Sequence, residues 1–225
     1  MATYDLEQQE QLDQVKHLWA KYGNLITWTM ILVLGAYAAF MGYQYWQNDR
    51  AVKAAGLFEE LDRSAAMGDT QKASRAFNDL KNNYAGTTFS EQGALLTAKV
   101  QSTKGKDDQA RASLSWEVEH GKNANLVAIA RLRLAGLLLD AKQYDAALTQ
   151  LKADMPAEFQ ALMQDRLGDV LMAQGKKDEA VKAYEQAYKS MEPMLDYRRF
   201  VEGKLTALGH APAVPAIPTP SVVAP

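Results

Sequence analysis

The sequence predicts an all-α protein, with a single N-terminal transmembrane helix followed by an α-solenoid of about four helix pairs. Residues 25–43 form an uncharged, apolar run of the length that spans a bilayer. From residue 44 to residue 208 good helix formers dominate, and the only prolines are Pro156 and Pro193. A pattern of small and large apolar residues recurs through this stretch, and no part of it alternates as a strand does.

The predicted membrane anchor has the sequence LITWTMILVLGAYAAFMGY, which is 19 residues long. A helix rises about 1.5 Å per residue, so this run covers roughly 28 Å, close to the hydrocarbon thickness of a bilayer. Aromatic residues flank both ends, as the two headgroup regions favour. The residues expected to face lipid or a second helix are Leu25, Ile31, Leu34, Gly35, Ala39 and Gly42.

Two alternatives to an uncleaved anchor are weaker. A buried core helix of a soluble protein is usually shorter and carries a polar stripe. A cleavable signal peptide could use the small residues Ala36 and Ala38, but the apolar run continues past them and the leading segment is long and acidic. Lysine and arginine are too evenly placed on the two sides of the run to predict its orientation.

The anchor separates a polar leader, residues 1–24, from a helical repeat domain, residues 44–208. In the leader, the spacing of Leu12, Val15, Leu18 and Trp19 fits either an amphipathic helix on the membrane surface or an extension of the anchor helix. Residues 209–225 are rich in proline and alanine and carry no formal charge, so we expect a disordered tail there.

Four segments of the repeat domain share one pattern, in which a turn leads into a helix with a small residue and a large apolar residue four positions later. The pairs are Ala73 and Phe77, Ala110 and Leu114, Ala147 and Leu151, and Ala180 and Tyr184, so the alanines are 37, 37 and 33 residues apart. Large-small pairs, Leu134-Ala135 and Leu167-Gly168, precede the last two alanines. This pattern resembles tetratricopeptide repeats, in which the small residues let the two helices of a pair cross closely. The alternative is an ordinary helical bundle.

No pattern in the sequence predicts catalysis or a bound cofactor. The chain has no cysteine, which excludes disulfides, thiolate metal sites and cysteine nucleophiles. Its net charge of −2 argues against a nucleic-acid partner. The three histidines, His17, His120 and His210, lack metal-ligand spacing, and neither a phosphate-binding loop nor a nucleophile elbow is present. We therefore expect a protein that is not an enzyme and holds neither metal nor cofactor.

The remaining candidate is a protein-binding groove lined by the first helix of each pair. Its mixture of apolar and charged residues suits an extended or partly folded polypeptide, although core packing is the alternative for the leucines. Counting repeat positions gives Phe58, Asp62, Leu95, Lys99, Leu139, Asp140, Asp165, Asp169 and Met172 as groove candidates.

The whole plan, from the leader through the anchor to residue 208, resembles the YfgM-type ancillary subunits of the bacterial Sec translocon. The resemblance rests on this architecture and on segments such as YQYWQNDRAVKAAGLFEEL and GDTQKASRAFNDLKNNYAGT, while the proline-rich tail lies outside the pattern. It implies a bacterial inner-membrane protein with a cytoplasmic N-terminus and a periplasmic repeat domain. The implied partners are SecYEG, a membrane-anchored prolyl-isomerase-type chaperone, and unfolded secreted or outer-membrane proteins. From the residues alone, a membrane-tethered scaffold for another envelope complex, without a chaperone role, remains an alternative.

Overall fold

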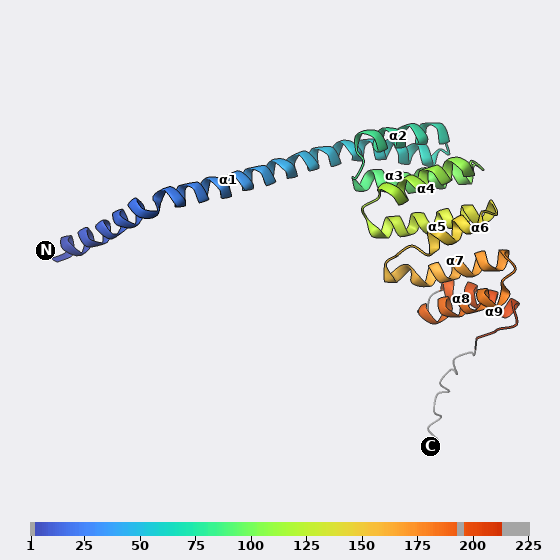
Figure 1. Ribbon diagram of the computed structural model, residues 1–225. Helices are drawn as coiled ribbons and strands as arrows, with labels where there is room; N and C mark the ends of the chain where they lie inside the picture. The colour runs from blue at the N-terminus through green and yellow to red at the C-terminus, as the bar shows by residue number, and fades with distance from the viewer. Residues whose placement is uncertain (1–2, 193–195, 213–225) are drawn as a thin grey trace, which may run out of the picture. The chain divides into compact units, whose positions relative to one another are not determined.

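A computed structural model describes the backbone of residues 3–192 and 196–212, and the side chains of Lys16 and of all these residues from Trp19 onward. The helices are α1 (Thr3–Ala66), α2 (Thr70–Asn83), α3 (Thr88–Thr103), α4 (Asp107–His120), α5 (Ala124–Asp140), α6 (Tyr144–Leu151), the 3-10 helix η1 (Ala157–Phe159), α7 (Gln160–Ala173), α8 (Lys177–Ser190) and α9 (Asp196–Ala207) (Figure 1). The described residues contain no strand, which agrees with the all-α prediction. Pro193 and tail residues 213–225 lie outside the described residues.

The chain divides into two compact units, residues 1–53 and residues 54–225. In the first unit, α1 carries one stretch that is long and apolar enough to cross a membrane. Its large apolar side chains are exposed, with Leu25 67%, Ile31 54% and Leu34 63% accessible. The hydroxyls of Thr27 and Thr29 donate to main-chain carbonyls one turn earlier, at 2.8 Å, so these polar groups are satisfied within the helix.

Within the predicted anchor, Gly35, Ala39 and Gly42 are also exposed, and a Cβ added at either glycine would meet no other atom within 4 Å. The leader backbone from Thr3 belongs to the same helix as the anchor. The leader therefore extends the anchor helix, one of the two alternatives that its sequence allowed. Most of its side chains, including Leu12, Val15 and Leu18, are not described.

The second unit is a stack of helix pairs: the end of α1 with α2, α3 with α4, α5 with α6, and α7 with α8, followed by the single helix α9 (Figure 1). From α2 to α9, each α-helix contacts the next along the chain, and the first helices α3, α5 and α7 also contact one another in series. Three buried clusters run through the stack, centred on Leu61 and Phe77, on Leu114 and Leu134, and on Tyr184 and Val201. Such a stack is a solenoid, because each pair buries its apolar surface against its neighbours.

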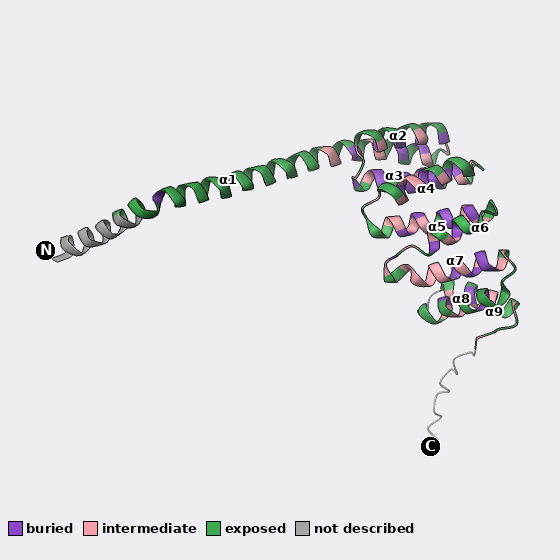
Figure 2. Cartoon of the chain, viewed as in Figure 1, coloured by how far each residue is buried: buried purple, intermediate pink, exposed green. Residues whose placement is uncertain are grey.

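The residues that defined the repeat pattern lie in this core. Each of the stacked helices carries buried residues along its length (Figure 2). The four repeat alanines, Ala73, Ala110, Ala147 and Ala180, are each 0% exposed. The large residue four positions after each alanine is also buried. A Cβ at Gly168 would collide with the ring of Tyr184, so the small residue on α7 is what lets α8 approach. The predicted solenoid of about four helix pairs is confirmed.

The turn inside each pair uses a left-handed residue five positions before the repeat alanine. Gly68, Gly105 and Gly175 have φ of 67°, 69° and 78°. The third pair has Lys142 at this position, with φ 60°, the only non-glycine residue with positive φ among the described residues. Glycine favours this conformation because it has no Cβ, so three of the four turns carry the residue that their backbone requires.

Candidate protein-binding groove

A hollow of about 500 Å³ lies along the first helices of the repeat unit, α3, α5 and α7. Ala98, Leu114 and Leu137 supply its apolar surface, and Lys99, Arg133, Asp140 and Arg166 supply its charges. We call this set of residues the central hollow. Successive first helices contact one another, and the hollow is lined by residues from all three of them. Helical-repeat solenoids use an extended concave surface for binding.

The two arginines of the central hollow are held by hydrogen bonds, Arg133 to a neighbouring helix and Arg166 within its own helix. Arg133 Nη1, on α5, donates to the main-chain carbonyl of Leu95 on α3 at 3.4 Å. Arg166 Nη1 donates to Asp169 Oδ2, one turn further along α7, at 3.3 Å. A Cβ at Gly136 would lie 3.8 Å from Cζ of Arg166, so this guanidinium lies over the α5 backbone at the glycine. The hollow therefore presents guanidinium groups whose positions are set by the fold.

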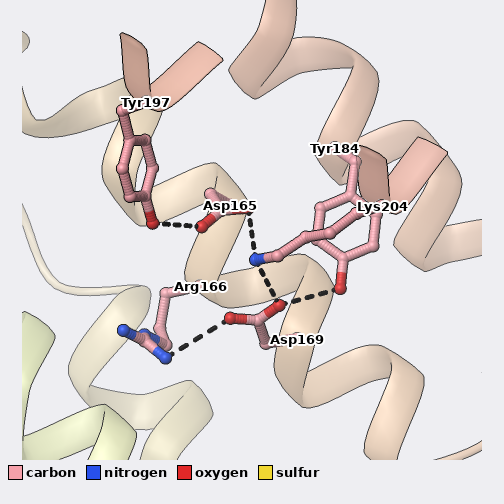
Figure 3. A network of polar contacts seen from close by, with 6 residues as sticks. All are labelled: Asp165, Arg166, Asp169, Tyr184, Tyr197 and Lys204. Atoms are coloured by element: carbon pink, nitrogen blue, oxygen red, sulfur yellow. Dashed lines mark hydrogen bonds and ion pairs between the residues drawn. The ribbon is translucent and has the colours of Figure 1, made fainter. Parts of the chain in front are cut away.

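A polar network next to the central hollow joins α7 to α8 and α9 (Figure 3). Lys204 Nζ, on α9, donates to Asp165 Oδ1 and to Asp169 Oδ1, both at 2.7 Å. The hydroxyl of Tyr197 donates to Asp165 Oδ2 at 2.7 Å, and that of Tyr184 to Asp169 Oδ1 at 2.9 Å. Asp165 is 1% exposed, so this carboxylate is satisfied inside the protein rather than by water.

The tyrosines of this network stay protonated and act as donors. Burial raises the pKa of Tyr197 to about 12, and its hydrogen bond to Asp165 and the negative charge of that carboxylate act in the same direction. Burial and Asp169 likewise raise the pKa of Tyr184 far above its ordinary value. The two hydroxyls therefore stay protonated across the physiological pH range and donate hydrogen bonds to Asp165 and Asp169.

A second buried carboxyl lies on α4. Glu117 is 0% exposed, and neither of its carboxyl oxygens has a hydrogen-bond partner in the part of the chain that the structure describes. Burial, together with the charge of Glu91, raises the pKa of Glu117 to about 8. Glu91 accepts from the main-chain N–H groups of Lys122 and Asn123, at 2.8 and 3.4 Å. Among the described residues, no three His, Asp or Glu side chains gather in a way that could hold a metal ion.

The structure brings only some of the predicted groove residues together. Lys99 and Asp140 both line the central hollow. Asp169 borders it through Arg166, whereas Asp165 is buried beneath α9 and bonded to Lys204. Asp62 is exposed.

The apolar groove candidates belong mainly to the core. Leu95 is 7% exposed, and Leu139 packs against the same cluster. Met172 is half-buried against the cluster of α7, α8 and α9. The ring of Phe58 lies 5.7 Å from that of Phe89. The contacts of Leu95 and Leu139 are those of core packing, which is the alternative role for the leucines.

Arg133 and Arg166, the two guanidinium groups of the central hollow, are not among the residues predicted from the sequence. Arg166 lies beside Asp165, a position that the repeat count had selected. Gly136 carries no clear signal for this place, because a Cβ there would make only ordinary contact with Arg166. The neighbour that approaches it, Arg166, comes from another helix 30 residues later, which the local pattern does not reveal.

An apolar helix that could span a membrane, followed by helix pairs with a small residue at each crossing, defines an anchored helical-repeat protein. A family model described as a tetratricopeptide repeat-like domain matches residues 16–210. An ancillary SecYEG translocon subunit of Neisseria gonorrhoeae is 30% identical over 207 residues, covering 90% of this chain and 98% of that protein. Proteins of the same name from Escherichia coli and Haemophilus influenzae are 29% and 26% identical, covering 84% of this chain and 91% and 92% of their own lengths.

The chain therefore belongs to the YfgM-type family of ancillary SecYEG translocon subunits, as the resemblance of its sequence implied. The family and the apolar stretch of α1 fit a single-pass protein of the bacterial inner membrane.

Proposed function

We propose that this protein is an ancillary subunit of the SecYEG translocon, and that its repeat unit binds polypeptides at the periplasmic exit of the channel. The observation that carries the proposal is the extent of the similarity to the Neisseria protein, which covers 98% of that protein and 90% of this chain. Because the match covers 90% of this chain, it includes residues 25–43 as well as the repeat unit, which supports the proposal.

The proposed mechanism is local concentration. A receiving surface that is tethered beside the channel meets each emerging chain at a higher effective concentration than a surface free in solution. The apolar stretch of α1 provides the tether, and the exposed small residues Gly35, Ala39 and Gly42 provide a face on which a helix of the channel can pack closely.

The concave surface of α3, α5 and α7 is the proposed receiving surface. Its occupants are a membrane-anchored chaperone of the prolyl-isomerase type, emerging secreted or outer-membrane clients, or both. The central hollow supports this proposal because it combines apolar walls with charged groups, as surfaces that bind extended segments do. In this arrangement the N-terminus is cytoplasmic and the repeat unit is periplasmic.

The test is co-purification in mild detergent of three proteins: the full chain, a chain that begins at Gln47, and a chain whose residues 25–43 are replaced by an unrelated apolar helix of equal length. We expect translocon subunits to accompany the full chain and to be lost from the other two. The replacement variant is the matched control, because it stays in the membrane. Recovery of a different membrane complex with the full chain would overturn the proposal in favour of another envelope scaffold.

The receiving role has a separate test, in which the full chain in detergent is mixed with an unfolded outer-membrane protein. We expect the aggregation of the client to slow in proportion to the amount of chain added. A scaffold without a receiving surface would leave the rate of aggregation unchanged.

A further inference from the structure

We infer that the central hollow selects polypeptide segments that carry aspartate or glutamate, with a client carboxylate bound by Lys99, Arg133 and Arg166. The inference rests on the proposed receiving surface and specifies the chemistry of what binds there. It is carried by the charges, the geometry and the apolar walls of the hollow.

The charge of the central hollow is opposite to that of the protein. The chain as a whole has a net charge of −2. Three cationic side chains line the hollow, Lys99, Arg133 and Arg166, against one carboxylate, Asp140. A concave surface that gathers one sign of charge attracts groups of the other sign, because its low-dielectric walls concentrate the field. The complementary ligand group is an anion.

The guanidinium groups are arranged to receive a carboxylate. Each has five N–H donors in a fixed plane, and that plane matches the two oxygens of a carboxylate. The structure places one nitrogen of Arg133 on the Leu95 carbonyl and one nitrogen of Arg166 on Asp169. These contacts hold the two side chains in place and occupy only part of their donor capacity.

Asp169 offsets the charge of Arg166 only in part. This carboxylate also accepts hydrogen bonds from Lys204 and Tyr184, at 2.7 and 2.9 Å. Its negative charge is therefore shared among three donors. Arg166 is positioned by Asp169 and still contributes positive charge to the hollow.

The walls of the hollow restrict the ligand further. The half-buried Leu137 supplies apolar surface beside the cations, and the core residues Ala98 and Leu114 also line the hollow. Charge-assisted hydrogen bonds beside such surface are stronger than in open water, and an apolar side chain of the ligand can cover the same surface. Because neighbouring side chains of an extended segment point in opposite directions, residues two apart reach the same face. The preferred segment therefore carries an acidic and an apolar residue two positions apart.

The experiment measures fluorescence anisotropy with the full chain in nanodiscs and two labelled octapeptides. The peptides share leucines and glycines and differ only in carrying glutamate or glutamine at two positions, and each is about 27 Å long when extended. At 50 mM salt we expect the glutamate peptide to bind about tenfold more tightly, in line with the added strength of charge-assisted hydrogen bonds. At 500 mM salt we expect most of this difference to disappear.

The variants Lys99→Glu and Arg133→Glu change exposed side chains, and we expect each to abolish the preference for glutamate. Lys182→Glu, an identical change of charge on an exposed residue of the outer helix α8, is the matched control and should retain the preference. Unchanged thermal unfolding of each variant verifies that the fold is intact, and Arg133→Gln serves where the charge reversal does not fold.

The outcomes separate this inference from the proposed function. Equal binding of both peptides by the full chain overturns the selection of acidic segments while leaving polypeptide binding in place. If the variants Lys99→Glu and Arg133→Glu keep the preference for glutamate, the site that binds glutamate lies elsewhere, and the inference is also overturned. If neither peptide binds, the receiving surface of the proposed function fails together with the inference.

Discussion

Glu117 is a single residue whose protonation state affects the stability of the repeat unit. It is fully buried on α4 near Glu91, and burial raises its pKa from the ordinary value of 4.5 to about 8. Between these two pH values, the folded chain holds a proton that the unfolded chain has released. The free energy of unfolding therefore falls as pH rises through this interval, and it stays at the lower level above pH 8.

The variant Glu117→Gln should remove this dependence, because a neutral amide replaces the carboxyl at nearly the same volume. One pKa unit corresponds to about 1.4 kcal/mol, so the whole shift from 4.5 to about 8 sets an upper limit of roughly 5 kcal/mol. Because the amide of the variant also lacks hydrogen-bond partners at this buried position, we expect a smaller gain, on the order of 1–3 kcal/mol at pH 8, and similar stability at pH 5. Chemical denaturation at both pH values measures this. Glu119→Gln, at an exposed position of the same helix, is the control, and equal pH dependence in both variants would contradict the prediction.

At the scale of single elements, α9 ends the solenoid by covering the last pair. Val201 and Leu205 are buried against the cluster of α7 and α8, and Lys204 reaches the carboxylates of Asp165 and Asp169. Phe200, by contrast, is 69% exposed. The helix is therefore held by one apolar face and by the two ion pairs of Lys204, which are partly shielded from water.

The variant Lys204→Met should loosen α9. It leaves Asp165, whose side chain is 2% exposed, without its cation, and breaking a buried pair in this way typically costs roughly 3–5 kcal/mol; the partial exposure of Lys204 places the expected loss nearer about 2 kcal/mol. In this variant, the hydrogen-exchange rates of the α9 amides should increase more than those of the α5 amides.

Two further variants test the cause. Lys189→Met breaks an exposed pair with Glu185 on α8 and should change stability by less than about 1 kcal/mol. Adding Asp165→Asn to Lys204→Met should restore part of the loss, because the uncompensated charge is gone. Unchanged exchange in α9 for Lys204→Met would show that its apolar face alone holds it.

At the scale of the whole molecule, the orientation in the membrane decides which compartment the proposed receiving surface serves. We predict that protease added to spheroplasts digests the repeat unit and leaves a fragment that contains the leader and anchor, because the repeat unit is proposed to be periplasmic. Tags at each terminus, detected by blotting, identify the fragment. Loss of the N-terminal tag with an intact repeat unit would show the opposite orientation. Lysed cells, in which protease reaches both sides, provide the control for digestion.

Features that depend on local sequence were predictable. The anchor follows from an uncharged run of sufficient length, since a bilayer imposes that length on any helix that crosses it. The repeat alanines were recognisable because a helix crossing at short distance requires a small residue at the same position of every pair. The structure places all four of these alanines in the core, each with a large apolar partner one turn later.

Features that join distant segments were decided by the tertiary structure. Asp165 looked like a groove residue by its repeat position, yet Lys204, 39 residues later, and Tyr197 cover and bind it. Arg133 and Arg166 lie on different helices and line one hollow only because α5 and α7 pack against each other. Helical periodicity assigns a face to each residue within its own helix, whereas the neighbour that covers or leaves open that face depends on how the helices pack.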